Sequence, residues 1–229
     1  THSTLCERPW PRMTPAYGPS VCIMSLRKSL PVVDGAVLVW LDGTEPAFCD
    51  GKPQLDGFCS ARALAMMLKS AHVADGFGSR EDYLLLFDQA EAALDNSFSP
   101  TSAMSPVSRS ILKRMDIEKI SRARRRNYSR LMTELERCEE VRAVFPGLPE
   151  SAVPLGFPVI MEDRDLLWKR LKSCGVHADI HWMLPPEVCD KEYPESAWLA
   201  GRILTLPCDQ RYSEEEMARM AQAVKACFR

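Results

Sequence analysis

A lysine-bearing turn between two apolar segments is the feature that most limits how this chain can fold. Lys28 lies in the segment 25–36, where Pro31 and the pair Asp34-Gly35 interrupt regular secondary structure. An apolar, β-branched run follows at once from Val37 to Leu41 and predicts a buried strand. A lysine held beside such a strand can lose part of its hydration, which a lysine that forms Schiff bases requires. Spacing alone also allows a solvated turn lysine.

Composition narrows the class of protein. Of the 229 residues, 46% are apolar and 26% are charged, which is ordinary usage for soluble proteins. The net charge of −2 argues against nucleic acid or an acidic membrane as a partner, and no apolar run approaches the roughly 20 residues of a membrane helix. Nine cysteines without a paired framework predict reduced thiols and a cytoplasmic location.

Apolar periodicity predicts short strands alternating with helices. Residues 97–108 are rich in Ser, Pro and Thr and predict a linker, whereas an apolar stripe over 107–139 predicts one long helix. The last helix should begin at a capping box formed by Ser213 and Glu216. Further strands are expected at 21–24, 158–161, 176–182 and 203–206, and further helices at 58–72, 81–94 and 163–174.

Two segments near the C-terminus extend the pattern set by the lysine turn. One reads Gly-Val-His-Ala-Asp-Ile-His-Trp over 175–182, and the other is an Ile-Leu-Thr-Leu-Pro strand, a short loop and an acidic-capped helix over 203–217. In this order the three segments resemble the DegT/DnrJ/EryC1/StrS family of pyridoxal-phosphate aminotransferases. The resemblance implies an α/β, fold-type I transferase. Residues 1–106 would be part of the large cofactor domain, 107–140 a bridging helix and 141–229 a small α+β domain.

The resemblance also assigns roles to single residues. Lys28 would form the Schiff base with pyridoxal 5'-phosphate and move the proton as general base and acid. Ser25 would bind the cofactor phosphate, although it precedes the lysine by three residues where the family usually has five. His2 would lie near the phenolic oxygen of the cofactor, and His181 would face the substrate. The expected substrates are an amino-acid donor and a keto sugar, including a nucleotide-linked one, and the expected assembly is a homodimer.

The start of the chain raises an alternative function. Family members carry an Asp-x-x-His/Gln motif before the lysine turn, and its Asp pairs with the pyridine nitrogen. If His2 ends this motif, the Asp lies upstream of Thr1, and we expect the chain to be the C-terminal part of an aminotransferase. Without that Asp the electron sink weakens, so the alternative is a non-catalytic remnant or interaction module with exposed apolar edges.

Other chemical interpretations of the same residues stay open. His181 can equally be a structural histidine, and Arg27 can contact the phosphate or lie at the surface. Cys174, His177, His181 and Cys189 allow a zinc site, but the two histidines would share a strand face away from Cys174, so we predict no metal.

An arginine-rich stretch also has two interpretations. It can bind nucleic acid or form a solvated or interdomain face, and nearby acidic residues at salt-bridging spacing favour the face. Its members are Arg122, Arg124, Arg125, Arg126 and Arg130.

Overall fold

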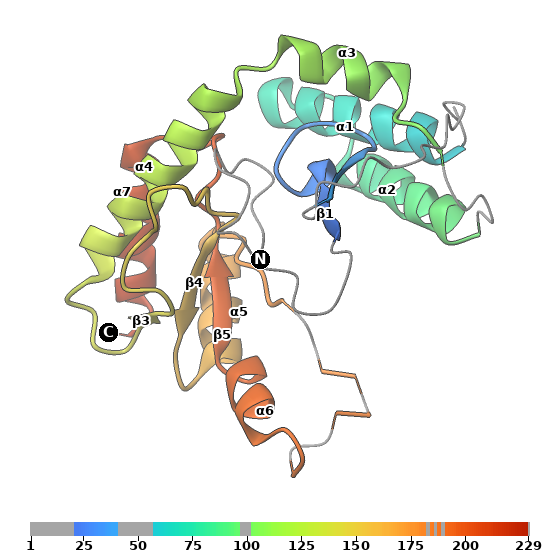
Figure 1. Cartoon of the computed structure of the whole chain (residues 1–229). Coiled ribbons are helices and arrows are strands. Elements are labelled where there is room, and N and C mark those ends of the chain that lie inside the picture. Colours follow the sequence, from blue (N-terminus) through green and yellow to red (C-terminus); the bar gives the residue numbers. More distant parts are fainter. Residues whose placement is uncertain are drawn as a thin grey trace. The chain divides into compact units, whose positions relative to one another are not determined.

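The described residues of this computed structural model form two units. They comprise residues 21–40, 57–96, 102–181, 184–185, 187–188 and 191–228. The N-terminal unit lies within Trp10–Met115 and the C-terminal unit within Asp116–Arg229. Figure 1 shows the labelled helices and strands of both.

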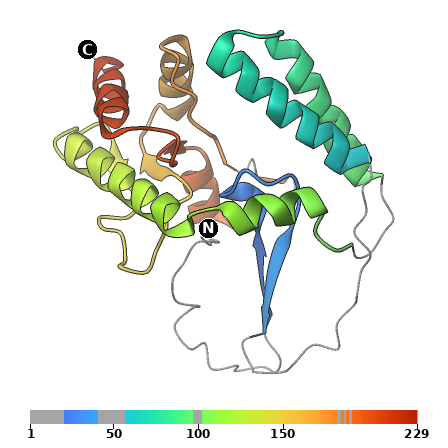
Figure 2. The same ribbon diagram turned by 90° about the horizontal axis from the view of Figure 1, so that it is seen from above.

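The N-terminal unit contains a β-hairpin and three helices. Strands β1 (Val21–Ser25) and β2 (Ala36–Trp40) pair antiparallel in the register Val21↔Trp40 to Ser25↔Ala36. The 3-10 helix η1 (Leu26–Lys28) begins the connection between them. Helices α1 (Gly57–Asp75) and α2 (Arg80–Asp95) form an antiparallel pair, and α3 (Pro106–Arg114) follows (Figure 2).

A small apolar core joins helices α1 and α2 to the connection between β1 and β2 that carries Lys28. It consists of Val33, Phe58, Cys59 and Ala90. Other apolar side chains of this unit face outward: Ile23 is 69% exposed, Met67 69% and Val73 75%. Exposed apolar surface is therefore concentrated in the unit that carries Lys28, as expected if its hairpin and helices cover only part of their apolar faces.

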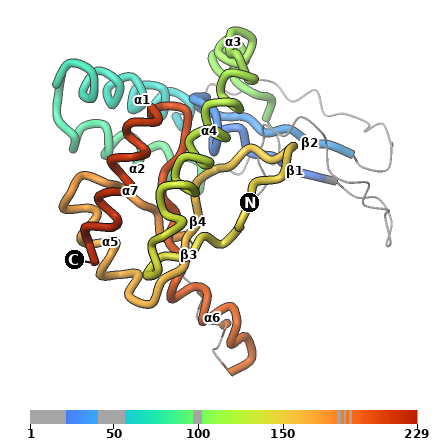
Figure 3. Tube along the Cα trace, turned by 90° about the vertical axis from the view of Figure 1, so that its left-hand side faces the viewer, coloured from blue at the N-terminus to red at the C-terminus, as the bar shows by residue number. Residues whose placement is uncertain are grey.

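The C-terminal unit is an antiparallel sheet packed with helices. The strand order is β3 (Arg142–Ala143), β4 (Phe157–Ile160) and β5 (Ile203–Leu206). Its helices are α4 (Ile117–Leu135), α5 (Arg164–Ser173), α6 (Pro194–Ala200) and α7 (Glu214–Ala226). Helices α4 and α7 pack against each other along their length (Figure 3).

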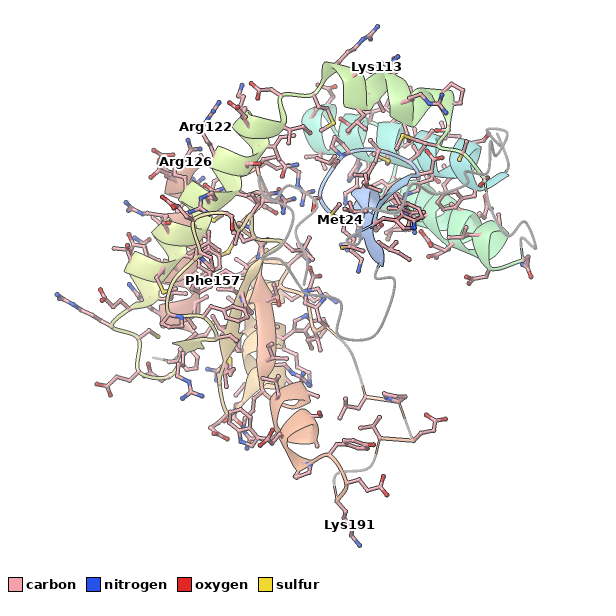
Figure 4. All side chains as sticks on the ribbon, viewed as in Figure 1. Met24, Lys113, Arg122, Arg126, Phe157 and Lys191 are labelled. Carbon is pink, nitrogen blue, oxygen red and sulfur yellow. The ribbon has the colours of Figure 1, made fainter. Side chains whose placement is uncertain are left out.

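One continuous core holds this unit together. Leu131 from α4, Leu171 from α5, Met217 from α7 and Leu204 from β5 are all 0% exposed. The ring of Phe157 meets the ring of Tyr128 edge to face at 4.7 Å, and Figure 4 shows Phe157 among the core side chains. Burial of such side chains contributes about 1.5–3 kcal/mol each, so this core is the main source of stability of the unit.

Most strands and helices that the sequence predicts are confirmed. Strands β1, β2, β4 and β5 and helices α1, α2, α5 and α7 lie where expected. Strand β2 is not the buried strand that its apolar run predicted, because Val37 and Leu38 are 37 and 41% exposed. The Ser213 hydroxyl accepts from the Glu216 N–H, and the Glu216 carboxylate accepts from the Ser213 N–H, which confirms the capping box. Gly175 ends α5 with a φ of +78°, a conformation that favours glycine.

Three expectations were wrong. The long helix expected over 107–139 is two helices, because Met115 is extended (ψ 135°) and Asp116 starts α4 by accepting from the Lys119 N–H at 2.8 Å. The linker expected over 97–108 includes the start of α3, where Ser105 caps the helix. Among the described residues of the strand expected at 176–182, only Asp179 pairs, through a single bridge to Thr205. Strand β3 and helix α6 were not predicted.

The arginine-rich stretch lies on α4, and each of its members has partners within the C-terminal unit. Arg122, Arg126 and Arg130 pair with Glu118, Glu214 and Glu134 at 2.9, 3.1 and 2.7 Å. Figure 4 labels Arg122 and Arg126 one turn apart on this helix. Arg125 donates to the Pro149 carbonyl at 2.7 Å. These pairs support the interpretation as a solvated face.

Arg124 differs from the others because it is buried, with 4% exposure. Its guanidinium donates to the carbonyls of Pro154 and Leu155 at 2.9 and 3.2 Å and to Gln210 at 2.7 Å. Asn127, one turn later, donates to the carbonyls of Asp209 and Tyr212, both at 2.9 Å. Two side chains of α4 therefore hold the loop between β5 and α7.

The same loop contains a buried carboxylate. Asp209 is 9% exposed and accepts two hydrogen bonds of 2.8 Å from the Arg211 guanidinium. Burial opposes its ionisation, but the hydrogen bonds and charge of Arg211, with the charge of Arg124, outweigh burial and lower the pKa of Asp209. Burial also raises the pKa of the neighbouring Cys208 thiol to about 12.

Replacing Asn127 with Ala should destabilise the C-terminal unit. Two carbonyls in the loop would lose their donor, which costs about 2–4 kcal/mol in the free energy of unfolding. The matched control is Ser129→Ala on the exposed side of α4, which should change stability by less than about 0.5 kcal/mol. Urea unfolding of the full chain followed by circular dichroism measures both, and equal effects of the two changes would contradict this role of Asn127.

Asp209 should make stability depend on pH. Because its folded pKa is lowered, its stabilisation is complete above the unfolded pKa of about 3.9 and is lost as pH falls through the folded value. Asp209→Asn should therefore cost about 1–3 kcal/mol at pH 7. The difference from the unchanged protein should shrink below about pH 4. Urea titrations between pH 3 and 8 test this, and a pH-independent difference would contradict it.

Candidate active site: the lysine turn

The connection between β1 and β2 is a hydrogen-bonded turn with Lys28 exposed on it. The Leu26 N–H donates to the Gly35 carbonyl at 3.1 Å, and the N–H groups of Ser29 and Leu30 donate back to the Leu26 carbonyl at 3.1 and 2.9 Å. Lys28 is exposed, whereas Leu26, Ser29 and Leu30 are 4, 6 and 5% exposed. The turn therefore presents Lys28 to solvent, and the loss of hydration beside a buried strand that the sequence suggested is not observed. The side chains next to the lysine are anchored in the unit.

Asp34 fastens the end of this turn to the start of α3. Its carboxylate accepts from the Ser105 N–H at 2.7 Å and from the Ser105 hydroxyl at 2.6 Å. The Ser108 hydroxyl in turn accepts from the N–H groups of Val33 and Asp34 at 3.1 and 3.2 Å. Ser105 and Ser108 are fully buried and Asp34 is half-buried, so little water competes for the serine groups of this network.

Gly35 permits the close approach between the turn and α3. Its φ is +111°, in the region that favours glycine. A Cβ at this position would lie 2.4 Å from the Met104 side chain. The backbone conformation therefore favours glycine after Asp34, whereas the contact could be relieved by a shift of the flexible end of the Met104 side chain.

Arg27, next to the lysine, is already bound to the helix pair. Its guanidinium donates to Glu91 of α2 at 3.1 Å and lies 5.0 Å from the Phe58 ring centroid. The structure therefore supports the surface interpretation, with a defined protein partner, over a direct phosphate contact.

Ser25 lies at the end of β1, half-buried, three residues before Lys28. Its side chain makes no capping hydrogen bond to η1. Five residues before the lysine, where the family usually has its phosphate-binding serine, the chain has Ile23. Ser25 thus stays the predicted phosphate ligand, and His2 lies outside the described residues.

His181 belongs to the C-terminal unit and is half-buried. Its segment is fixed two residues earlier, where Asp179 and Thr205 exchange backbone hydrogen bonds of 2.9 Å each. The Trp168 indole also donates to the Ala178 carbonyl at 3.0 Å. Cys189 of the zinc alternative lies outside the described residues, and those that are described contain no cluster of three metal-binding side chains.

Sequence reasoning missed three residues that support the turn. Ser105 and Ser108 fell in the expected linker, although Ser before Pro is a common start of a helix and signals a cap. Glu91 had no signal, because an exposed glutamate on a helix gives no indication of a partner that is distant in sequence.

The comparison with protein families identifies the chain. The sequence model of the DegT/DnrJ/EryC1/StrS aminotransferase family matches residues 102–225, more than half of the 229 residues. The chain therefore belongs to this family and to the α/β fold-type I class of pyridoxal-phosphate-dependent transferases, which confirms the resemblance and the fold class expected from the sequence. The matched segment includes His181 and begins after the lysine turn.

Several solved structures are also similar. The sugar aminotransferase CalS13 from Micromonospora echinospora is 17% identical over 52% of this chain and 33% of its own, with a TM-score of 0.45. A DegT DnrJ EryC1 StrS aminotransferase from Brucella abortus is 20% identical over 62% of this chain and 43% of its own, with a TM-score of 0.43. The chain spans less than half the length of these structures. No curated protein matches it.

Within the described ranges, no helix combines the length and the apolar character that crossing a bilayer requires. The six cysteines in these ranges carry free thiols.

The lysine turn fits the covalent attachment of pyridoxal phosphate. The cofactor carries an aldehyde, and an exposed primary amine on a fixed turn is the group that reacts with it. Among the described residues next to the lysine, the Ser25 hydroxyl can donate to a phosphate, whereas the Arg27 guanidinium is occupied by Glu91.

Replacing Asp34 with Ala should loosen the lysine turn. The Ser105 N–H and hydroxyl would lose their acceptor, which costs about 1–3 kcal/mol in the stability of the N-terminal unit. Asp88→Ala, on an exposed position of α2, is the matched control and should change stability by less than about 0.5 kcal/mol. Thermal unfolding together with hydrogen exchange at residues 26–35 gives the measurement. Unchanged exchange there in the Asp34 variant would contradict the fastening role.

Proposed function

We propose that this protein acts as a pyridoxal-phosphate-dependent aminotransferase. It would transfer an amino group from an amino-acid donor to a keto sugar or a similar carbonyl compound, including a nucleotide-linked sugar. Family membership supports the reaction class. The observation that carries the proposal is the exposed Lys28 on a turn whose neighbours are buried and hydrogen-bonded.

Lys28 is the covalent catalyst in this proposal. When bound, the cofactor supplies the aldehyde and an electron-accepting ring. The Lys28 amine would hold the cofactor covalently at its aldehyde carbon and, once freed by the donor amine, would accept and return a proton as general base and acid. A fixed turn suits this role because the amine must return to the same position in each cycle.

The remaining site residues bind rather than react. Ser25 would donate its hydroxyl to the cofactor phosphate, His2 would contact the phenolic oxygen, and His181 would contact the substrate. The homodimer and the cytoplasmic location expected from the sequence belong to the same proposal, as does the division into a partial large domain, a bridging segment and a small domain.

The proposal is tested by mapping where the cofactor attaches. The full chain is mixed with pyridoxal phosphate, reduced with borohydride and digested for mass spectrometry. Attachment should occur at Lys28 in preference to Lys113, an exposed lysine of the same unit that Figure 4 labels on α3. A donor amino acid should reduce the attachment, because its amine displaces the lysine.

Two variants make the test decisive. Lys28→Arg keeps the charge and should abolish the specific attachment, whereas Lys113→Arg should leave it unchanged. Equal attachment to both lysines in the unchanged protein would contradict the proposal and favour the alternative, a non-catalytic interaction module whose exposed apolar side chains, such as Ile23, contact a partner.

A further inference from the structure

Two arginines from different elements meet on one carboxylate beside the lysine turn. Arg27 of η1 and Arg62 of α1 both donate to the same oxygen, Oε1 of Glu91 on α2, at 3.1 and 2.6 Å. Glu91 thereby links three elements that are otherwise separate in the sequence. The Arg27 and Arg62 side chains are 26 and 20% exposed, whereas the Glu91 side chain is 48% exposed, so these bonds are only partly shielded from solvent.

Both guanidinium groups lie over aromatic rings. The Arg27 guanidinium lies 5.0 Å from the centroid of the Phe58 ring, and the Arg62 guanidinium lies 6.0 Å from it and 5.4 Å from the Phe87 ring. Phe58 itself is 4% exposed and belongs to the core of the unit. Contact with a buried ring stabilises each guanidinium beside Glu91.

The Glu91 carboxylate offsets the repulsion between the Arg27 and Arg62 guanidinium groups. Burial lowers the pKa of Arg62, and the nearby charge of Arg27 lowers it further, whereas Glu91 acts in the opposite direction. Without Glu91, two half-buried like charges would face each other over Phe58. The arginine on the short turn η1 would then move more easily than the one held within the long helix α1.

We propose that Glu91, acting through Arg27, is a positioning residue that holds the lysine turn so that Lys28 is presented in one orientation. We call the contact of Arg27 and Arg62 with Glu91 the clamp. The inference rests on the proposed function, since it holds that this clamp positions the catalytic lysine. Arg27 and Lys28 are consecutive residues of η1, and the turn is closed by hydrogen bonds to the Leu26 carbonyl. A displacement of the Arg27 side chain therefore acts directly on the backbone that carries Lys28.

The first measurement is hydrogen exchange of the turn, which does not involve the cofactor. In Glu91→Gln and Arg27→Gln, the amides of Ser29 and Leu30 should exchange about two- to fivefold faster, the range expected for loss of a partly shielded ion pair. Asp88→Asn makes the same charge change on the exposed side of α2 and is the matched control. Unchanged exchange in Glu91→Gln, or equal acceleration in Asp88→Asn, would overturn the clamp.

The second measurement is the ratio of pyridoxal phosphate attached to Lys28 and to Lys113 after borohydride reduction. Glu91→Gln should lower this ratio by about two- to fivefold, and the reversed pair Arg27→Glu with Glu91→Arg should restore it. Restoration would show that the ion pair, rather than either side chain alone, positions the lysine. Faster exchange with an unchanged ratio would overturn the positioning role.

The two measurements separate failure of this inference from failure of the proposed function. If the unchanged protein shows no preference for Lys28, the proposed function and the positioning of a catalytic lysine both fail, whatever the exchange rates. If the preference is present and Glu91→Gln leaves both it and the exchange unchanged, only the clamp is wrong.

Discussion

The hydrogen bonds between Asp34 and the start of α3 are the interaction on which the candidate site depends. The Asp34 carboxylate accepts hydrogen bonds from the N–H and hydroxyl of Ser105, the N-cap of α3. The Ser108 hydroxyl completes the network by accepting from the backbone of the turn. Because Ser105 and Ser108 are buried, their polar groups have little water to replace a lost partner, which favours keeping the turn and the start of α3 together. These bonds hold the backbone that presents the exposed Lys28, the lysine of the proposed site.

The C-terminal unit uses the same principle in a different place. There, Arg124 and Asn127 of α4 bind the carbonyls of two loops, and Asp209 binds Arg211 within one of them. In both units a short irregular segment is fixed by side chains of a neighbouring helix rather than by its own regular structure. The turn that precedes β2 and the loop that precedes α7 are therefore both held by hydrogen bonds to a neighbouring helix or its N-terminal residues.

Local signals in the sequence predicted much of the fold. The capping box at Ser213 and the stop at Gly175 were correct because both depend on residues within one turn of the helix. The break at Met115 was missed because the apolar stripe continues across it, and Asp116 can start a helix as well as lie within one. The strand expected around Asp179 was wrong because its apolar pattern says nothing of how many residues find a partner.

The sequence by itself determined the family, the fold class and the choice of Lys28, since these depend on motifs and on local spacing. Only the tertiary structure decided what holds that lysine turn. Ser105 lies 71 residues from Asp34, and Glu91 lies 64 residues from Arg27. Hydrogen bonds and ion pairs over such separations follow from how helices pack, and many serines and glutamates in the sequence would serve equally well. Packing selects among them, because a polar partner contributes most where burial has removed the competing water.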